Sequence, residues 1–521
     1  MIQSALFSVT DKTNLSSFAK GLLEIFPEIR FLASGNTAKE LKEASLPVIP
    51  IEVATGFPEC FGGRVKTLHP RIAGGILQRR GQDDREAKQL GIEPINLVVC
   101  NLYAFEKAAA NPSLSIDELF EQMDIGGSTL IRSACKNLPH TVVVTDPKDY
   151  STLLEELRKT KEISLQTKKQ LALKALRLSA SYEEALLRVF SDRLLGEEIR
   201  TLPLTHGRKL RYGENPDQEG WVYSTGESSG VAGAEVLGGK ELSYNNYEDA
   251  SNAYLAAKGL LDLGAKEGAV VIKHGGICGY AMGPNAFRHA WNGDPKSAYG
   301  SVIALASAAT DALIEELRGK FIEVLIAPDF SDSFVAWAKK AKPNLRLLKV
   351  SYVSQDRFRL RGIAGGLLIQ SAKPRLLEKD RRVPTQKQVD AHQEPLLAFT
   401  WAAAAFSKSN AIAIAHEVEK GSYQLLGVGA GQPNRIDSME KLAIPRALET
   451  LSRQGQNPSL SHSVLASDGF FPFADSIHIA GKAGIGTCIQ PGGSIHDDEV
   501  IAAANEYGMC MIFTNERTFN H

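Results

Sequence analysis

Short apolar runs rich in β-branched residues alternate with amphipathic, helix-like segments along most of the chain, and this alternation constrains the fold more than any other feature. Buried strands are indicated at 95–100, 141–145, 268–274, 321–328, 411–416, 424–431 and 510–514. Helix-like segments such as 14–26 and 497–508 lie between them. Strands that alternate with helices are typical of layered α/β domains. We therefore predict an α/β protein with parallel or mixed sheets, and we see no internal repeat.

The length and charge of the chain narrow its class. A chain of 521 residues is too long for one hydrophobic core and should divide into roughly three domains. Its 43% hydrophobic and 23% charged residues are ordinary for a globular enzyme. A net charge of -1 gives no electrostatic case for a nucleic-acid or membrane-surface partner. Any basic site must therefore be local.

The cysteines and the first residues of the chain predict a cytoplasmic protein. Six scattered cysteines form no CxxC pair and no cluster at zinc spacing, which argues against a disulfide framework and a structural zinc. The first residues lack a basic segment followed by an apolar one, as in a signal peptide. No apolar run approaches the ~20 residues that cross a bilayer.

Composition also suggests where the chain divides. The segment after Asp146 is rich in Lys, Glu and Leu and has no strand pattern, which indicates helices. A polar stretch marked by Gly and Pro then begins at about residue 205. We predict a first domain at 1–146, a helical connector at 147–199 and a second region at 200–521.

The run GGRVKTLHP at 62–70 is the clearest candidate for an anion site. It places Arg64, Lys66, Thr67 and an imidazole in one loop. Glycines give its backbone freedom, and a proline ends it. Arg offers a planar fork and Lys a mobile charge, which together suit a phosphate or another oxyanion. The alternative is a solvated basic turn.

Four further polar clusters follow predicted strands, at 8–15, 33–41, 101–105 and 124–137. Ligands of open α/β sheets bind beyond the carboxyl ends of the strands. The glycines of SGNT and DIGG would offer backbone N–H groups to an anion. Each cluster also has a structural explanation: helix caps at 34, 37 and 124, a solvated Lys136, and a packed Tyr103.

Taken together, SVTDK, SGNTAK, GGRVKTLHP, NLYAF and DIGGSTLIRSACKN resemble the inosine monophosphate (IMP) cyclohydrolase domain of the bifunctional purine biosynthesis family in order and spacing. The resemblance covers essentially the whole chain. It differs at Asn36, where the family usually has glycine, although Asn tolerates a left-handed backbone. The resemblance implies a methylglyoxal-synthase-like fold that closes a purine ring: a carboxamide nitrogen attacks a formyl carbon of the same substrate, and water is lost.

The resemblance also implies roles for residues of this domain. Asp124 would orient or deprotonate the amide, while Lys66, Tyr103 and Lys136 would stabilise charge and supply a proton. The predicted substrate-binding residues are Ser8, Lys12, Ser34, Gly35, Thr37, Arg64, Thr67, Asn101, Gly126 and Gly127.

A second constellation lies beyond residue 200. KLRYGENPDQ supplies Arg211 and Tyr212, and VVIKHGGICG places Lys273 and His274 at the end of a buried strand. Taken alone, such a strand-end pair is more often structural or exposed. The runs nevertheless resemble the family's second part, aminoimidazole carboxamide ribonucleotide (AICAR) formyltransferase. This implies two cytidine-deaminase-like α/β subdomains, divided near 370–395, and formyl transfer from 10-formyltetrahydrofolate to the 5-amino group of AICAR.

In this second part the resemblance implies His274 as the base that accepts the amine proton and Lys273 as the group that stabilises the oxyanion or assists the leaving folate nitrogen. Arg211 and Arg517 would clamp the phosphate or carboxamide, with Tyr212 beside them. Nucleotide or folate would further contact Asn410 and Arg435, and find a flat wall at Phe471 and Phe473. Core packing is an equally good explanation of the two phenylalanines.

Departures from the family pattern concern mainly the second part. KHGGICG replaces KHxNPCG, and Ala474 stands where the family has arginine. One alternative is therefore a cyclohydrolase with an impaired formyltransferase, and another is a non-catalytic purine-nucleotide sensor. A zinc deaminase is the poorer hypothesis, because the H-x-E and P-C-x-x-C ligands are missing. The family implies a homodimer with a shared formyltransferase site, no zinc, and room for a monovalent cation.

Overall fold

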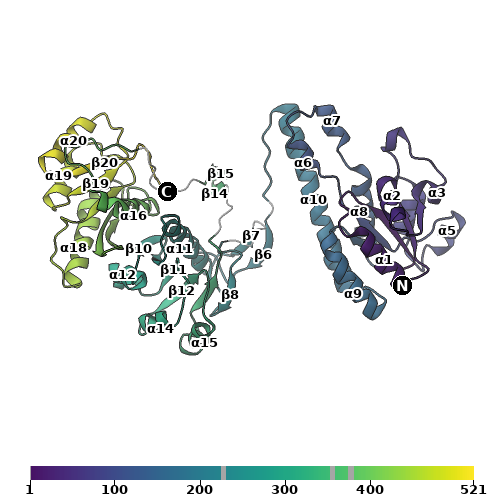
Figure 1. Ribbon diagram of the computed structural model, residues 1–521, viewed down its shortest axis with the longest axis horizontal. Coiled ribbons are helices and arrows are strands. Elements are labelled where there is room, and N and C mark those ends of the chain that lie inside the picture. Colours follow the sequence, from purple (N-terminus) through teal and green to yellow (C-terminus); the bar gives the residue numbers. More distant parts are fainter. Residues whose placement is uncertain (1, 203, 225–229, 353–357, 373–380) are drawn as a thin grey trace. The chain divides into compact units, whose positions relative to one another are not determined.

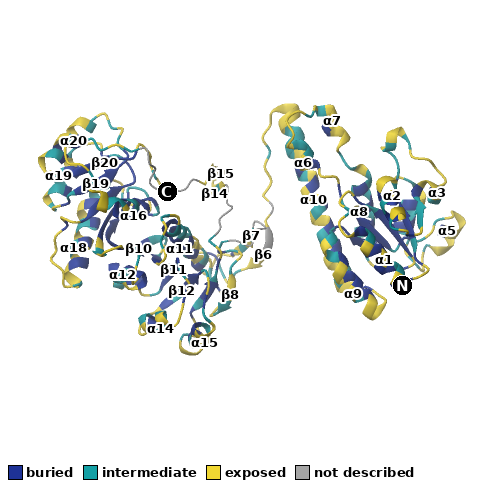
Figure 2. Cartoon of the chain, viewed as in Figure 1, coloured by how far each residue is buried: buried dark blue, intermediate teal, exposed yellow. Residues whose placement is uncertain are grey.

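The computed structural model describes residues 2–202, 204–224, 230–352, 358–372 and 381–521. The chain forms two compact units, Met1–Leu202 and Pro203–His521 (Figure 1). In each unit the buried residues concentrate on the sheets and on the helix faces that cover them (Figure 2). None of the helices in these ranges combines the length and apolar character that a membrane crossing needs.

The first unit is built on a parallel five-stranded sheet of order β3-β2-β1-β4-β5. Its strands are β1 Ser4–Ser8, β2 Arg30–Ala33, β3 Val48–Pro50, β4 Leu97–Cys100 and β5 Val142–Val144. From β1 the chain adds β2 and β3 on one side, and it later adds β4 and β5 on the other side. The loops after β1 and β4 therefore diverge to opposite sides of the sheet. Ligands of such sheets bind in the crevice at this switch point.

Helices cover both faces of this sheet because its strands bury alternate side chains on opposite sides. Ala5 and Phe7 belong to the core under α1, α2 and α9, whereas Leu6 belongs to the core under α4, α8 and α10. The helices are α1 Leu15–Ile25, α2 Gly35–Glu43, α3 Ile51–Thr55, α4 Pro70–Leu77, α5 Asp84–Gln89, α6 Phe105–Ala109, α7 Ile116–Glu121, α8 Ile125–Lys136, α9 Tyr150–Thr160 and α10 Leu165–Leu195. The segment predicted as a connector, 147–199, thus contributes two helices to the first unit.

The second unit contains a mixed eleven-stranded sheet of order β20-β19-β18-β16-β17-β10-β9-β11-β12-β13-β8. Its strands are β8 Glu235–Gly238, β9 Gly268–Lys273, β10 Gly276–Met282, β11 Ser301–Leu305, β12 Ile322–Ala327, β13 Arg346–Lys349, β16 Ile412–Glu419, β17 Ser422–Gly429, β18 Val464–Ser467, β19 Thr487–Gln490 and β20 Cys510–Phe513. Two antiparallel ribbons stand apart from it: β6 Thr205–Lys209 with β7 Trp221–Ser224, and β14 Phe358–Ile363 with β15 Gly366–Ser371.

The large sheet is a structural duplication, which agrees with the two α/β subdomains that the family resemblance implies, although the sequence shows no internal repeat. From β10 through β9, β11, β12 and β13 the neighbour relations are antiparallel, antiparallel, parallel and parallel. From β17 through β16, β18, β19 and β20 they follow the same pattern. The halves join through β10 and β17. The predicted division near 370–395 falls between them, and 373–380 within it lies outside the described residues.

Equivalent helices in the two halves share one core. The two central helices, α11 Tyr244–Asp262 and α16 Glu394–Ala405, precede β9 and β16 and pack together against one face of the sheet. The opposite face is covered in one half by α12 Ala286–Gly293, α13 Pro295–Ala298, α14 Ala312–Leu317 and α15 Asp332–Ala341, and in the other by α18 Ile444–Arg453, α19 Asp475–Lys482 and α20 Asp497–Glu506.

Candidate active sites

An open cavity of about 740 Å³ lies in the first unit, where the loops after β1, β2 and β4 meet the loop at 62–68 and the start of α8. This is the switch point at which parallel sheets bind ligands. Of the predicted residues, the following line it: Ser8, Lys12, Ser34, Gly35, Thr37, Arg64, Lys66, Thr67, Asn101, Tyr103, Asp124, Gly126 and Gly127. Residues scattered over more than 100 positions of sequence are thus brought to one place.

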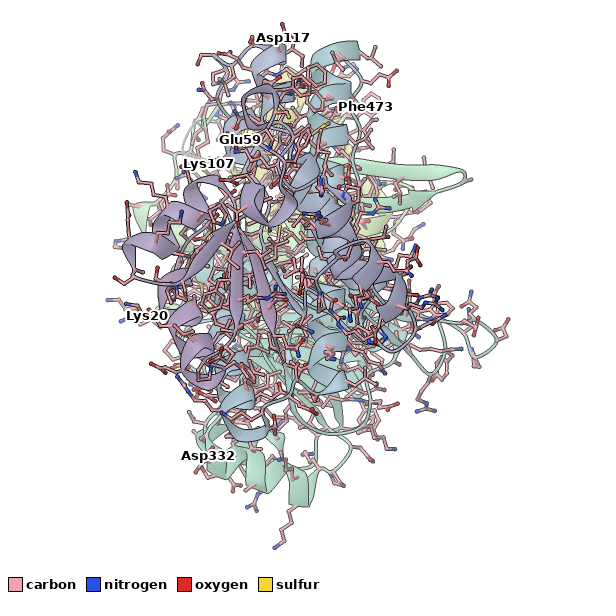
Figure 3. The ribbon with its side chains drawn as sticks, turned by 90° about the vertical axis from the view of Figure 1, so that its right-hand side faces the viewer. Lys20, Glu59, Lys107, Asp117, Asp332 and Phe473 are labelled. Atoms are coloured by element: carbon pink, nitrogen blue, oxygen red, sulfur yellow. The ribbon has the colours of Figure 1, made fainter. Side chains whose placement is uncertain are left out.

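The loop that carries Lys66 depends on glycine. Phe61, Gly62 and Gly63 all have left-handed backbones, with φ of 55°, 63° and 94°. A Cβ atom at Gly63 would lie 2.5 Å from Lys66 Cε, and one at Gly35 would lie 3.5 Å from Lys66 Nζ. The ammonium therefore reaches across Gly63 towards the start of α2. The carboxylate of Glu59, labelled in Figure 3, lies 3.4 Å from Lys66 Nζ.

Asp124 is the N-cap of α8, and its carboxylate accepts a hydrogen bond of 2.7 Å from the backbone N–H of Gly127. Burial raises the pKa of Asp124, and backbone N–H groups of Gly127 and Tyr103 oppose the shift. A Cβ atom at Gly126 would lie 2.8 Å from Thr67 Oγ1, so the Thr67 hydroxyl lies against the first turn of α8. A partly desolvated carboxylate of this kind is suited to accept a proton near neutral pH.

Two predicted binding residues are engaged with the cavity wall. The hydroxyl of Thr37 donates to the Val9 carbonyl at 3.1 Å and accepts from the Val9 N–H at 3.3 Å. The Asn101 side chain accepts from the backbone N–H groups of Thr10 and Asp11 and donates to the Asp11 carbonyl. These bonds hold the loop after β1 against α2 and β4. The two side chains thus shape the site.

The structure does not bring Lys136 to this cavity. Lys136 is the last residue of α8, whereas Asp124 caps its first turn. A rise of 1.5 Å per residue separates the two ends of the helix by roughly 16 Å. Lys136 is exposed, so its predicted contact with the substrate is not supported within this unit. The motif is continuous in sequence, but it forms a helix whose first turn lines the cavity and whose last residue lies away from it.

Several residues that the sequence analysis did not single out also line the cavity, among them Phe120, Glu121 and Met123. They directly precede Asp124, and this adjacency was the available signal. Glu121 lies 3.5 Å from Arg64 in an exposed ion pair. An exposed pair of this kind contributes little to stability, so Arg64 can exchange this partner for a ligand at small cost.

In the second unit, one edge of the large sheet gathers the predicted polar segments. The antiparallel and parallel registers place the carboxyl ends of β9, β17, β18, β19 and β20 at the same edge. Lys273 and His274, Arg435, Phe473 and Arg517 follow these strands. Segments from both halves of the duplication therefore meet at one edge, as ligand-binding loops of layered α/β proteins do.

Lys273 and His274 lie at a tight hairpin turn. Lys273 pairs with Gly276, which leaves His274 and Gly275 as a two-residue turn with φ of 52° and 73°. Two successive positive φ angles define the hairpin turn that matches the twist of the strands. The Asp249 carboxylate on α11 accepts from the N–H groups of His274 (3.2 Å) and Gly275 (2.7 Å). The imidazole of His274 is exposed, so it is held at the edge and open to a ligand.

The neighbouring strand ends hold a buried ion pair. The guanidinium of Arg435 donates to Asp468 Oδ1 at 3.2 and 3.0 Å, and Asp468 is fully buried. Burial raises the pKa of Asp468, and the charge of Arg435 opposes that shift. Both Arg435 and Arg517 lie over the ring of Phe519, at 5.5 and 5.8 Å. Asn410 donates to the Gln432 carbonyl at 2.8 Å. The three predicted residues Asn410, Arg435 and Arg517 thus lie in one region.

The two predicted aromatic walls differ in position. Phe471 is fully buried in the core formed with α18, α19 and α20, so it cannot stack on a ligand, and this prediction is wrong. Phe473, labelled in Figure 3, is 53% exposed, and its ring lies 5.1 Å from that of His496. In the run FFPF the sequence alone does not distinguish the buried Phe471 from the exposed Phe473.

Arg211 and Tyr212 follow β6. The Arg211 guanidinium lies 5.5 Å from the Tyr212 ring. Burial is the main cause that lowers the pKa of Arg346 on β13, and the positive charge of Arg211 lowers it further. Arg346 lies 3.7 Å from Glu323. Arg211 therefore lies near the outer strands of the first half of the sheet.

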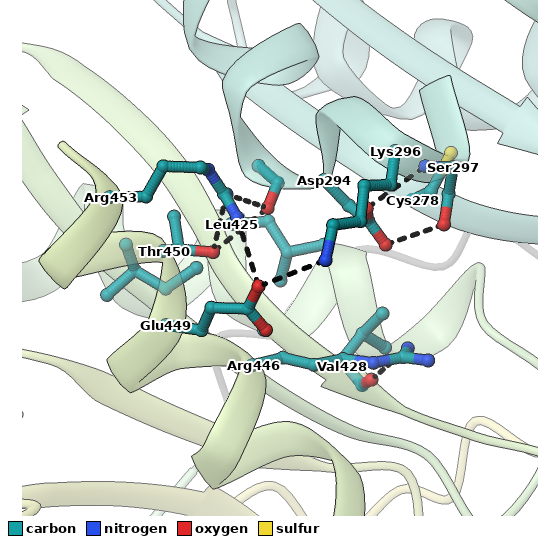
Figure 4. A pocket seen from close by; sticks show the side chains of 13 residues that line it. Cys278, Asp294, Lys296, Ser297, Leu425, Val428, Arg446, Glu449, Thr450 and Arg453 are labelled. Carbon is teal, nitrogen blue, oxygen red and sulfur yellow. Dashed lines mark hydrogen bonds and ion pairs between the residues drawn. The ribbon is translucent and has the colours of Figure 1, made fainter. Parts of the chain in front are cut away.

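A second cavity, of about 170 Å³, lies between α13 and α18 (Figure 4). Glu449 lies 3.8 Å from both Lys296 and Arg453, and Arg453 also donates to the carbonyl groups that end α12. Burial raises the pKa of Cys278 to about 12, so this thiol is protonated at neutral pH. The pair of Lys296 and Glu449 links the two halves of the sheet, and so do the bonds from Arg453 to the end of α12. They indicate a role in joining the halves.

Among the described ranges, no group of three or more His, Cys, Asp and Glu side chains is arranged to hold a metal ion. The cysteines, all of which are described, are free thiols.

Two family models match the chain. A model described as "AICARFT/IMPCHase bienzyme" matches residues 134–446, and one described as "MGS-like domain" matches 14–129. Among solved structures, the chain titled "Crystal structure of ForH" is 33% identical, covers 37% of this chain and 98% of its own, and has a TM-score of 0.34.

Full-length relatives carry the name "Bifunctional purine biosynthesis protein PurH". The protein from Lactobacillus delbrueckii subsp. bulgaricus is 40% identical, that from Persephonella marina 39%, and that from Bacillus cereus 40%, in each case over 100% of both chains. These matches cover the whole length of the chain and therefore both units. The chain belongs to the family of bifunctional purine biosynthesis proteins, with an MGS-like domain followed by an AICARFT/IMPCHase region.

Proposed function

We propose that this chain catalyses the last two steps of IMP synthesis: formyl transfer from 10-formyltetrahydrofolate to the 5-amino group of AICAR, followed by dehydrative ring closure of the formylated nucleotide. The observation that carries the proposal is the presence of two separate polar sites, one in each unit, built from the residues that match the family. Scattered free cysteines support a cytoplasmic location.

For ring closure, the cavity of the first unit would hold the formylated nucleotide. The start of α2 and the basic groups of Lys12 and Arg64 suit its phosphate. The carboxamide nitrogen attacks the formyl carbon of the same molecule, so holding the two groups together supplies much of the rate. Asp124 takes the amide proton as the C–N bond forms, and Lys66 stabilises the oxygen anion. Tyr103 protonates this oxygen, and Asp124 returns its proton to it, so that the oxygen leaves as water. The formamide nitrogen gives its proton to the Tyr103 phenolate as the ring C=N bond forms.

For formyl transfer, the edge of the second sheet would hold AICAR and the folate. The amine attacks the formyl carbon and His274 accepts the amine proton. The C–N bond to the folate nitrogen then breaks as that nitrogen takes up the proton from the imidazolium. Lys273 is held beside this point because its ammonium donates to the Tyr299 carbonyl. The exposed ring of Phe473 offers a surface for a flat heterocycle. His274 and Gly275 form a tight turn that Asp249 holds in place. We therefore expect this site to be active although KHGGICG differs from the family pattern.

The test is a steady-state assay with AICAR and 10-formyltetrahydrofolate that follows tetrahydrofolate and IMP, run beside a second assay supplied with the formylated nucleotide. We expect both assays to yield IMP. If only the supplied intermediate cyclises, the second unit has lost its transferase activity. If neither reaction proceeds although the nucleotide binds, the proposal fails in favour of a nucleotide sensor.

We further propose a homodimer in which the β14–β15 ribbon meets a second copy. Both strands of this ribbon are exposed, and its apolar side chains Leu360, Ile363, Leu367, Leu368 and Ile369 are each more than 40% exposed. An isolated two-stranded ribbon is marginally stable in water, and exposed apolar patches of this kind mark interaction sites. A second copy that covers the ribbon supports a formyltransferase site shared between subunits.

Accordingly, Leu368→Glu should convert the dimer to a monomer in analytical ultracentrifugation and lower formyl transfer at least tenfold, because a charge at a desolvated contact costs well over the ~1.4 kcal/mol that a tenfold change represents. Cyclisation should continue. Leu173→Glu is the matched control for an added charge, because Leu173 lies on α10 of the first unit and is as exposed as Leu368. A Leu368→Glu protein that stays dimeric would refute the interface.

A further inference from the structure

The N-terminus of α8, which carries Asp124, is held by a side chain from the last helix of the first unit. Asp124 donates its backbone N–H to the hydroxyl oxygen of Tyr182 at 2.8 Å. The same hydroxyl donates to the Gln122 carbonyl at 3.3 Å. Tyr182 lies on α10, 58 residues further along the chain. One hydroxyl thus bridges the two backbone groups on either side of Met123, immediately before the carboxylate.

The hydroxyl that makes this bridge is rigidly placed. Tyr182 is only 7% exposed, and its ring packs edge-on against Phe105 at 6.3 Å. α10 lies beside α8, as Figure 1 shows, and it also packs against β5 in the same core. A buried phenol has to find hydrogen-bond partners, and here both partners belong to the segment that enters α8. The position of this segment is therefore coupled to the packing of α10.

The geometry of the carboxylate depends on this segment. Asp124 has an extended backbone, with φ of -86° and ψ of 105°, and its carboxylate turns back to the Gly127 N–H. Its own N–H points the other way, to Tyr182. The backbone of Asp124 is thus fixed from one side by Tyr182, and its side chain is fixed from the other side by the first turn of the helix.

We propose that Tyr182 is a positioning residue for ring closure, which orients Asp124 towards the carboxamide, and that α10 is consequently part of the cyclohydrolase site. The inference rests on the proposed function, because it requires Asp124 to act on the substrate. Tyr182 itself does not line the 740 Å³ cavity, and it acts through the backbone of Asp124.

The test compares Tyr182→Phe with the unaltered full-length protein, with kcat and KM measured for cyclisation of the supplied formylated nucleotide. Loss of the two hydrogen bonds that fix this segment should lower kcat about tenfold and leave KM within about twofold, because the phosphate and ribose contacts are untouched. Formyl transfer, measured on the same sample, should be unchanged. Ser179→Ala, a buried hydroxyl three residues earlier on α10, is the matched control and should cyclise normally.

The outcomes separate the inference from the proposed function. An unchanged kcat for Tyr182→Phe overturns the positioning role, and so does a loss that Ser179→Ala shares. Asp124→Asn is measured in parallel: if it cyclises normally, the role of Asp124 in the proposed function is what fails. If Tyr182→Phe does not fold, 3,5-difluorotyrosine at position 182 keeps the shape but weakens the hydroxyl as an acceptor. It should then lower kcat alone, and an unaltered kcat would again overturn the inference.

Discussion

Replacing Lys66 by alanine should lower the rate of ring closure by on the order of 10²–10³, because one preorganised donor to a developing oxyanion contributes about that much. The ammonium is held over Gly63 and beside Glu59 at the cavity wall. Its removal leaves the charge on the attacked formyl oxygen uncompensated. The measurement is IMP formation from the supplied formylated nucleotide.

Formyl transfer by the same variant should stay within about twofold, since Lys66 lies in the other unit and the loss concerns only one transition state. Lys39→Ala is the matched control: Lys39 lies on α2 of the same unit and faces Glu43 at 3.9 Å in an exposed pair. Equal losses of both activities in Lys66→Ala would contradict the assignment of two independent sites.

The second large effect is expected at His274. Alanine at this position should lower formyl transfer by on the order of 10²–10⁴, the usual contribution of a general base, while ring closure continues. The imidazole stands at the exposed hairpin turn between β9 and β10, and the turn itself is held by Asp249. The measurement is tetrahydrofolate release from 10-formyltetrahydrofolate in the presence of AICAR.

Backbone strain has to be separated from chemistry in this experiment, because His274 has a left-handed φ of 52°. Asparagine adopts that conformation more readily than alanine, so His274→Asn preserves the turn and should lose as much activity as His274→Ala. A loss confined to the alanine variant would mean that the turn, and not the base, was removed. His392→Ala is the remote control, since His392 lies beside Gln393, which contacts the amino end of β19, at the opposite edge of the sheet.

The sequence predicted the site motifs in which functional residues stand next to a glycine turn. The loop with Lys66 and the N-cap Asp124 lie in runs of glycine and polar side chains, and parallel strands bring such runs to one edge whatever the details of packing. The left-handed backbone at Gly63 and the hairpin turn at Gly275 are local consequences of glycine. These features could be predicted because they depend on a few consecutive residues.

Other features could not be predicted because they depend on direction and burial in three dimensions. Lys136 belongs to the same motif as Asp124, yet it lies at the far end of α8, roughly 16 Å from the start of that helix. Phe471 and Phe473 are two residues apart, yet one is in the core and the other is exposed. No internal repeat in the sequence marks the duplication of the large sheet, which only the family resemblance implied, because hydrophobic packing accepts many sequences for one strand pattern.

By itself the sequence determined the α/β class, the family and most of the residues that surround the first cavity, since periodicity and local turn chemistry act over short stretches of chain. Only the tertiary structure decided which of those side chains face a ligand and which are engaged in the wall, as Thr37 and Asn101 are. It also revealed Tyr182, whose hydroxyl reaches Asp124 across 58 residues. The physical reason is that such a bond depends on how α10 packs on α8, which no local pattern encodes.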